Sequence, residues 1–168
     1  MSLSCTTSKP ARRVVGIGEM IVSSATEDSL ITFSLGSCLG ISVYEPQVKV
    51  GGLIHCMLPC SSIDTGRQRF NPYRYIDSGL IALLEAVLEL GGEPSRFRIK
   101  VGGAAAPLDA CGRFKIGEKN LDMLCRILDK NGLPLAASDV GGTAPRTMSL
   151  HIGSGRTSIR KMGKEAEL

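Results

Sequence analysis

The alternation of residue types over residues 39–58 predicts a β-hairpin. This hairpin constrains the fold more than any other feature of the sequence. Ile41 and Val43 alternate with small or polar residues on the first strand, and residues 50–54 form the second strand. The segment Glu45-Pro46-Gln47-Val48 between them has the composition of a short loop, in which the proline fixes its own φ. The two strands are therefore expected to lie antiparallel and next to each other.

The register of this hairpin decides whether a thiol and an imidazole meet. Cys38 lies in a Gly36-Ser37-Cys38 turn before the first strand, and His55 lies on the second strand. If Tyr44 pairs with Lys49, Cys38 falls directly opposite His55, and the β-carbons of such cross-strand neighbours are about 5 Å apart. A thiol that meets an imidazole has the minimum equipment for nucleophilic attack on an amide carbonyl. Cys38 and His55 are therefore a candidate nucleophile and base.

The same residues also have purely structural interpretations. A cysteine beside glycine in a strand is commonly a small hydrophobic residue, and His55 would be costly to bury without a partner. The second histidine, His151, is expected at the surface or at the edge of the core, close to a glycine turn. Gly36-Ser37 would let a substrate amide approach and offer N–H groups to an oxyanion, or would form a β-bulge. Gly102-Gly103 and Gly141-Gly142 each follow a predicted strand and would line the same rim.

Composition excludes several other classes of protein. The chain has 168 residues, 43% of them hydrophobic, and its net charge of +4 comes from scattered basic residues that do not favour nucleic-acid binding. No apolar run approaches the roughly 20 residues that span a bilayer. Glycines and a glutamate interrupt the place where a signal core would lie. We therefore expect a globular protein of the cytoplasm that does not insert into a membrane.

Neither disulfides nor cofactors are expected. The six cysteines are irregularly spaced in a chain large enough to fold without disulfides, so they should be free thiols. His55, Cys56 and Cys60 do not predict a zinc site, because neighbouring strand residues point to opposite faces and no second ligand pair has finger-like spacing. Glycine patterns that bind phosphate are absent from the sequence, so nucleotide binding is not expected.

Strands outnumber helices in the predicted elements, and hairpins join most neighbouring strands. One helix is expected to begin with Asn71 as N-cap and Pro72 as its first residue and to end at Gly91-Gly92, and a second to cover residues 118–131. The expected strands outside the hairpin are 14–22, 30–33, 97–101, 135–140, 147–152 and 156–159. This pattern predicts an α+β fold, a layered α/β sandwich with a mostly antiparallel or mixed sheet.

A single domain is expected to cover most of the chain. We place it at residues 14–160, because strands and helices with clear patterns follow one another there without a linker. Residues 1–13 are polar and aperiodic and are expected to be disordered, and residues 161–168 are expected to form a C-terminal tail.

Five motifs occur in an order that resembles the chemoreceptor glutamine deamidases, the CheD family. They are L-G-S-C at 35–38, H-C-M-L-P at 55–59, G-G-A at 102–104, I-G-E-K-N at 116–120 and D-V-G-G-T at 139–143. The resemblance covers residues 14–160 and implies a sandwich related to toxin-type cysteine deamidases. It also implies hydrolysis of particular glutamine side chains of methyl-accepting chemotaxis receptors to glutamate, without metal or cofactor.

The resemblance assigns roles to three residues. It implies Cys38 as nucleophile, His55 as general base and Thr32 as the third member, which orients the histidine. The implied reaction is attack of the Cys38 thiolate on the amide, loss of ammonia and hydrolysis of the thioester by water. The expected oxyanion and substrate rim consists of Gly36, Ser37, Gly102 and Gly103. Two positions depart from the family pattern, Pro145 in place of glycine and Val101 in place of the commoner phenylalanine.

The resemblance also implies partners. These are the cytoplasmic domains of chemoreceptors as substrate and, for some members, a CheC-type phosphatase. Two alternatives stay open from the sequence. One is a regulatory binding module for such a phosphatase with little deamidase activity. The other is a cysteine peptidase or a transglutaminase-like acyl transferase, which would use the same pair of side chains.

Overall fold

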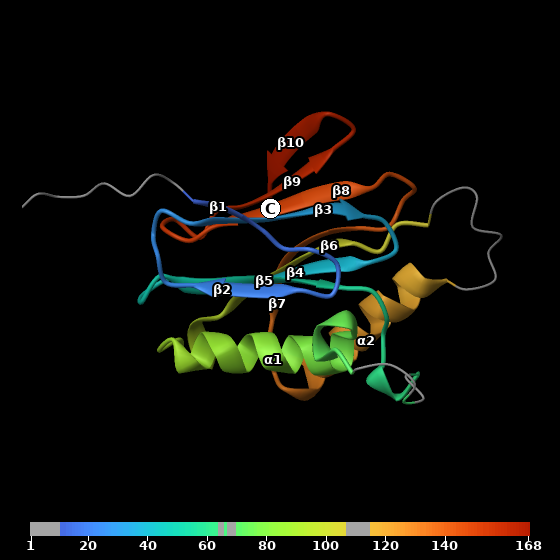
Figure 1. Ribbon diagram of the computed structural model, residues 1–168, viewed down its shortest axis with the longest axis horizontal. Helices are drawn as coiled ribbons and strands as arrows, with labels where there is room; N and C mark the ends of the chain where they lie inside the picture. The colour runs from blue at the N-terminus through green and yellow to red at the C-terminus, as the bar shows by residue number, and fades with distance from the viewer. Residues whose placement is uncertain (1–10, 64–65, 67–69, 107–114) are drawn as a thin grey trace, which may run out of the picture.

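In the part of the chain that the structure describes, two β-sheets and two α-helices form three stacked layers, and the helices cover one sheet only (Figure 1). The computed structural model describes residues 11–63, 66, 70–106 and 115–168. An outer sheet has the strand order β1-β3-β8-β9-β10, and a central sheet has the order β2-β5-β4-β6-β7. Only β1 with β3 and β6 with β7 pair in parallel among the strand pairs of the described residues. The expected α+β sandwich is confirmed, with its strands divided between two sheets.

The bounds of these elements follow in chain order. The strands are β1 (Arg12–Val14), β2 (Met20–Ser23), β3 (Ser29–Leu35), β4 (Leu39–Glu45), β5 (Val50–Cys56), β6 (Arg98–Gly103), β7 (Leu135–Val140), β8 (Arg146–His151), β9 (Thr157–Lys161) and β10 (Lys164–Glu167). The α-helices are α1 (Ile76–Glu89) and α2 (Ile116–Lys130), and three short 3-10 helices are η1 (Ser61–Ile63), η2 (Pro72–Arg74) and η3 (Pro94–Arg96). No helix in these ranges is long and apolar enough to cross a membrane.

The central sheet is covered on both faces, so β4 and β5 are buried along their whole length. Strand alternation assigns each side chain to one of two apolar layers. Ile41 and Val43 belong to the cluster between the central sheet and the helices. Tyr44 and Leu53 belong to the cluster between the two sheets, and Cys38 packs against that cluster. The candidate nucleophile therefore lies at the layer between the sheets.

The register of the β4–β5 hairpin differs from the predicted one by two residues. Tyr44 pairs with Gly51 instead of Lys49, so Gly40, and not Cys38, is the residue directly opposite His55. A shift by an even number of residues keeps every side chain on its face of the sheet. Cys38, the residue just before β4, therefore stays on the same side of the central sheet as His55 and packs against the layer between the sheets.

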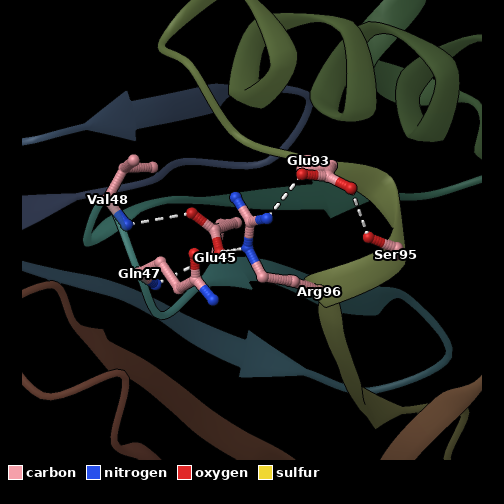
Figure 2. A network of polar contacts seen from close by, with 6 residues as sticks. All are labelled: Glu45, Gln47, Val48, Glu93, Ser95 and Arg96. Carbon is pink, nitrogen blue, oxygen red and sulfur yellow. Dashed lines mark hydrogen bonds and ion pairs between the residues drawn. The ribbon is translucent and has the colours of Figure 1, made fainter.

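The physical reason for this register is the side chain of Glu45, the last residue of β4. Its carboxylate accepts the backbone N–H groups of Gln47 and Val48, at 3.1 and 3.0 Å. It also lies 2.6 Å from Nε of Arg96. Figure 2 shows the two side chains facing each other. The loop thus comprises residues 46–49, with Glu45 inside the strand and Val50 opposite it. Alternation of apolar residues in the sequence does not reveal that a carboxylate closes the loop in this way.

Two other predicted elements are corrected. Residues 14–22 do not form one strand, since β1 and β2 belong to different sheets. The turn between them is closed by a bond of 2.8 Å from the N–H of Gly16 to the Glu19 carboxylate. Asn71 caps η2 instead of α1, because its Oδ1 accepts the N–H of Tyr73. The first α-helix begins only at Ile76, after the extended residue Tyr75.

The ordered structure extends beyond the expected domain limits at both ends. Strand β1 begins at Arg12, inside the segment expected to be disordered, and residues 1–10 lie outside the described residues. Strand β10 forms in the expected tail, where it pairs antiparallel with β9. Both strands are fully exposed edges, so burial leaves no apolar pattern in their sequences.

Candidate active site

Cys38 lies where the chain crosses from the outer to the central sheet. Strand β3 ends at Leu35 in one sheet, and β4 begins at Leu39 in the other. The end of β6 holds this crossover, because the N–H of Ala104 donates to the Cys38 carbonyl at 3.0 Å and the N–H of Ala105 donates to the Gly36 carbonyl at 2.8 Å. The cysteine is partly buried and its thiol is free. Its backbone is fixed while its side chain keeps some access to solvent.

The predicted rim residues lie in different surroundings. Gly103 has a φ of +123°, and a β-carbon there would lie 2.1 Å from the carbonyl oxygen of Cys38, so only glycine allows this approach. A β-carbon at Gly36 would meet no atom of the described residues within 4 Å. Gly102 faces Ile159 inside the layer between the sheets. Gly36 and Gly103 thus border the cysteine, whereas Gly102 supports it from the core.

The second glycine pair lies beside this rim. The N–H of Gly141 donates to the carbonyl of Gly103, and the N–H of Ala106 donates to the carbonyl of Gly142. Arg146 holds the loop that follows, through the carbonyls of Gly141 and Ala144 and the carboxylate of Asp139. The loop from β7 to β8 therefore lies against the strand end that supports Cys38.

His55 and Thr32 meet between the two sheets. Both side chains are buried, with exposed fractions of 1% and 0%. Thr32 Oγ1 lies 2.8 Å from His55 Nδ1 and 2.8 Å from the carbonyl oxygen of Val15. A hydroxyl has one proton, and only that proton can satisfy a carbonyl, so the histidine Nδ1–H must donate to Thr32. This assigns the proton of the neutral ring to Nδ1 and leaves the lone pair on Nε2.

The electrostatics of the site favour an uncharged resting pair. Burial lowers the pKa of His55 to about 4, so the imidazole is neutral at pH 7. Burial also raises the pKa of the Cys38 thiol, although its own backbone N–H acts in the opposite direction. Within the described part of the chain, His55 Nε2 is buried without a hydrogen-bond partner. Nε2 is therefore a free acceptor on the face that carries Cys38.

Gly40 lets side chains of the outer sheet pack closely against β4 on this face. It is the residue opposite His55, and a β-carbon there would lie 2.8 Å from the Leu35 side chain and 3.3 Å from the Thr32 methyl group. A larger residue would require the side chains of Leu35 and Thr32 to move. His151 lies elsewhere, exposed at the end of β8, where its Nδ1 is 3.0 Å from Ser154 Oγ.

Asn120 is a residue of the site that sequence reasoning missed. It lies on α2 and is fully buried, and its Nδ2 donates to the carbonyls of Ser37 and Met57, each at 3.0 Å. These carbonyls flank the two candidate catalytic residues. A signal was present, because Asn120 is one helical turn before the inward-facing Leu124, where an apolar residue is expected.

Comparison with known proteins shows which family this chain is similar to. A family model described as CheD chemotactic sensory transduction matches residues 57–161, more than half of the chain. The chain belongs to the CheD family. A probable chemoreceptor glutamine deamidase CheD from Solibacter usitatus is 43% identical over 155 residues, which are 92% of each protein. A CheD protein of the same description from Pyrococcus horikoshii is 40% identical over 88% of this chain and 91% of its own.

A third CheD relative extends the comparison to another bacterium. The protein from Syntrophus aciditrophicus, described as probable chemoreceptor glutamine deamidase CheD 1, is 37% identical over 89% of this chain and 94% of its own length. The resemblance noted in the five sequence motifs is therefore confirmed at the level of the family.

Proposed function

We propose that this protein is a chemoreceptor glutamine deamidase of the cytoplasm, which hydrolyses glutamine side chains of receptor signalling domains to glutamates. The observation that carries the proposal is the bond of 2.8 Å between Thr32 Oγ1 and His55 Nδ1. It leaves Nε2 as a proton acceptor on the face shared with the thiol of Cys38. The names of the CheD relatives supply the substrate class.

The proposed reaction begins from a neutral thiol and a neutral imidazole. As Sγ of Cys38 attacks the side-chain carbonyl carbon of glutamine, Nε2 of His55 accepts the thiol proton. The resulting imidazolium keeps its Nδ1–H on Thr32 and gives the Nε2 proton to the departing ammonia. A water molecule then attacks the thioester with His55 again as base, and glutamate and the free thiol result. One water is consumed and one ammonia is released for each glutamine.

Backbone N–H groups at the turn stabilise the oxyanion in this proposal. The N–H of Cys38 lies close enough to its own sulfur to lower the pKa of the thiol. An oxygen bonded to the carbon that Sγ attacks would enter the reach of the same N–H. Gly36 has no side chain, and no atom of the described residues lies within 4 Å of where its β-carbon would be, which favours approach of the substrate side chain at this point.

A receptor fragment carrying glutamine tests the proposal. We expect the wild-type protein to release ammonia and to add one dalton per modified glutamine, read by peptide mass spectrometry. Cys38→Ala and His55→Ala should each lower the rate at least about 1,000-fold, because nucleophile and base act as a unit. Cys60→Ala is the matched control, since Cys60 is another partly buried free thiol.

Other outcomes identify the alternatives. Cleaved peptide bonds or incorporated amines would indicate a peptidase or a transglutaminase-like enzyme instead. A wild-type protein that binds a CheC-type phosphatase but releases no ammonia would be a regulatory binding module. Normal deamidation by Cys38→Ala would exclude the proposed mechanism.

A further inference from the structure

The amide of Asn120 connects the two halves of the candidate active site. Its Nδ2 lies 3.0 Å from the carbonyl oxygen of Ser37 and 3.0 Å from that of Met57. Two acceptors require two donors, so the amide nitrogen and not the oxygen must face them. The two carbonyl oxygens are thereby kept within about 6 Å of each other.

The positions of these carbonyls in the chain give the amide its significance. Ser37 immediately precedes Cys38 in the turn between the sheets, and Met57 follows His55 by two residues at the end of β5. The hairpin pairing of β4 with β5 ends at Leu39 and Cys56. Beyond these residues, Asn120 joins the turn to the strand end.

The packing of α2 brings Asn120 to this place. One turn earlier, a β-carbon at Gly117 would lie 2.8 Å from the backbone carbon and oxygen of Ala104, so the helix approaches this segment as closely as glycine permits. The N–H of Ala104 in turn holds the carbonyl of Cys38. Leu124 anchors the next turn of the helix in the cluster below the central sheet. The I-G-E-K-N motif thus supplies a close approach at its glycine and two donors at its asparagine.

An asparagine at this position is costly for packing alone. Its Oδ1 is buried and has no hydrogen-bond partner among the residues that the structure describes. A buried polar atom without a partner destabilises a fold, and a leucine would fill an inward helix position without that cost. The two hydrogen bonds that Nδ2 donates therefore explain why an asparagine, and not an apolar residue, stands at this position.

We infer that Asn120 is a positioning residue, which keeps the Cys38 turn beside the end of the His55 strand so that the thiol proton can pass to Nε2 during the reaction. The inference rests on the proposed deamidase function. It predicts that Asn120→Leu and the nearly isosteric Asn120→Asp lower kcat for glutamine deamidation about 10- to 100-fold. KM should stay within about twofold, because the amide is buried away from the substrate.

A double-mutant cycle with His55 separates positioning from general support of the fold. The readout is the rate at which iodoacetamide alkylates Cys38 at pH 7, mapped by peptide mass spectrometry, and it needs no substrate. In the wild-type background, His55→Ala should slow alkylation, because the base is lost. In the Asn120→Leu background, His55→Ala should have no further effect, because the base is already out of reach.

Leu124→Ala is the matched control on the same face of α2. It should lower the thermal midpoint but leave kcat and the effect of His55→Ala unchanged, with all assays run well below each midpoint. If Asn120→Leu does not fold, Asn120→Asp is carried through the same cycle. An equal effect of His55→Ala with and without Asn120 would overturn the positioning role of Asn120 but would leave the proposed deamidase function standing. If His55→Ala leaves alkylation unchanged even in the wild-type background, the proposed base fails, and the inference fails with it.

Discussion

Thr32 and His55 belong to facing sheets, and Oγ1 of the threonine lies 2.8 Å from Nδ1 of the histidine. The partner of the histidine is a neutral hydroxyl, whereas serine proteases place a carboxylate there. A hydroxyl fixes the tautomer and the orientation of the ring but adds no negative charge to stabilise an imidazolium. The low pKa of His55, about 4, agrees with such a site.

Replacing Thr32 with valine tests the orienting role. Valine keeps the shape but cannot accept the Nδ1–H, so the ring loses its fixed tautomer and a buried donor loses its partner. We expect kcat for deamidation to fall about 10- to 100-fold in Thr32→Val. Thr32→Ser should retain most of the activity, because the hydroxyl remains. Equal loss in the two variants, measured by ammonia release, would contradict an orienting role for the hydroxyl.

The buried imidazole makes the stability of the fold depend on pH. In the unfolded chain histidine titrates near 6.5, while in the folded protein the pKa of His55 is about 4. Between these values the unfolded state binds more protons, so stability is complete above pH 6.5 and is lost as the pH falls towards 4. The loss due to His55 should be roughly 3 kcal/mol. Urea unfolding of wild type and His55→Gln checks this, since only their difference isolates the histidine from the acidic groups.

The resting state of the nucleophile can be observed directly. Burial raises the pKa of the Cys38 thiol, and a neutral imidazole offers it no positive charge. We therefore expect no thiolate absorbance from Cys38 at pH 7, in contrast to the thiolate–imidazolium pairs of papain-like proteases. The measurement is the ultraviolet difference spectrum of wild type against Cys38→Ala during a pH titration. A thiolate signal already present at pH 6 would show that the pair is ionised.

The turn of the central hairpin depends on the Glu45 carboxylate. It accepts two loop N–H groups and pairs with Arg96, and these contacts lower its pKa. Glu45→Gln should reduce the free energy of unfolding by about 1.5–3 kcal/mol, the usual contribution of a hydrogen bond to a buried charged group. Glu93→Gln, at the exposed end of the same network, should leave stability nearly unchanged (Figure 2). Chemical denaturation of both variants distinguishes the two cases.

Sequence patterns predicted the hairpin and its faces, but not its register. Alternation of Ile41 and Val43 sets which face each side chain occupies, and this part of the prediction is confirmed. The register depends on the Glu45 carboxylate, which binds two loop N–H groups and also Arg96, a residue far away in the sequence. The break between β1 and β2 was missed for a similar reason, because the Glu19 carboxylate that closes the turn looks like any surface residue.

In the candidate site, too, local patterns were readable from the sequence, whereas contacts between distant residues were not. Cys38 and His55 were proposed as a pair because a hairpin brings its two strands together, and the observed shift of two residues leaves both on the same face. Thr32 was reached only through the family resemblance, since its contact with His55 crosses between two sheets whose packing the sequence does not reveal. Asn120 was missed although a polar residue on the inward face of an amphipathic helix is a readable signal.

The split of the site between two sheets makes the contact between those sheets a condition of its chemistry. His55 lies on β5 of the central sheet, whereas Thr32 lies on β3 of the outer sheet. A substitution in the apolar layer between the sheets that shifts one sheet against the other would therefore separate the hydroxyl from the ring without changing either residue.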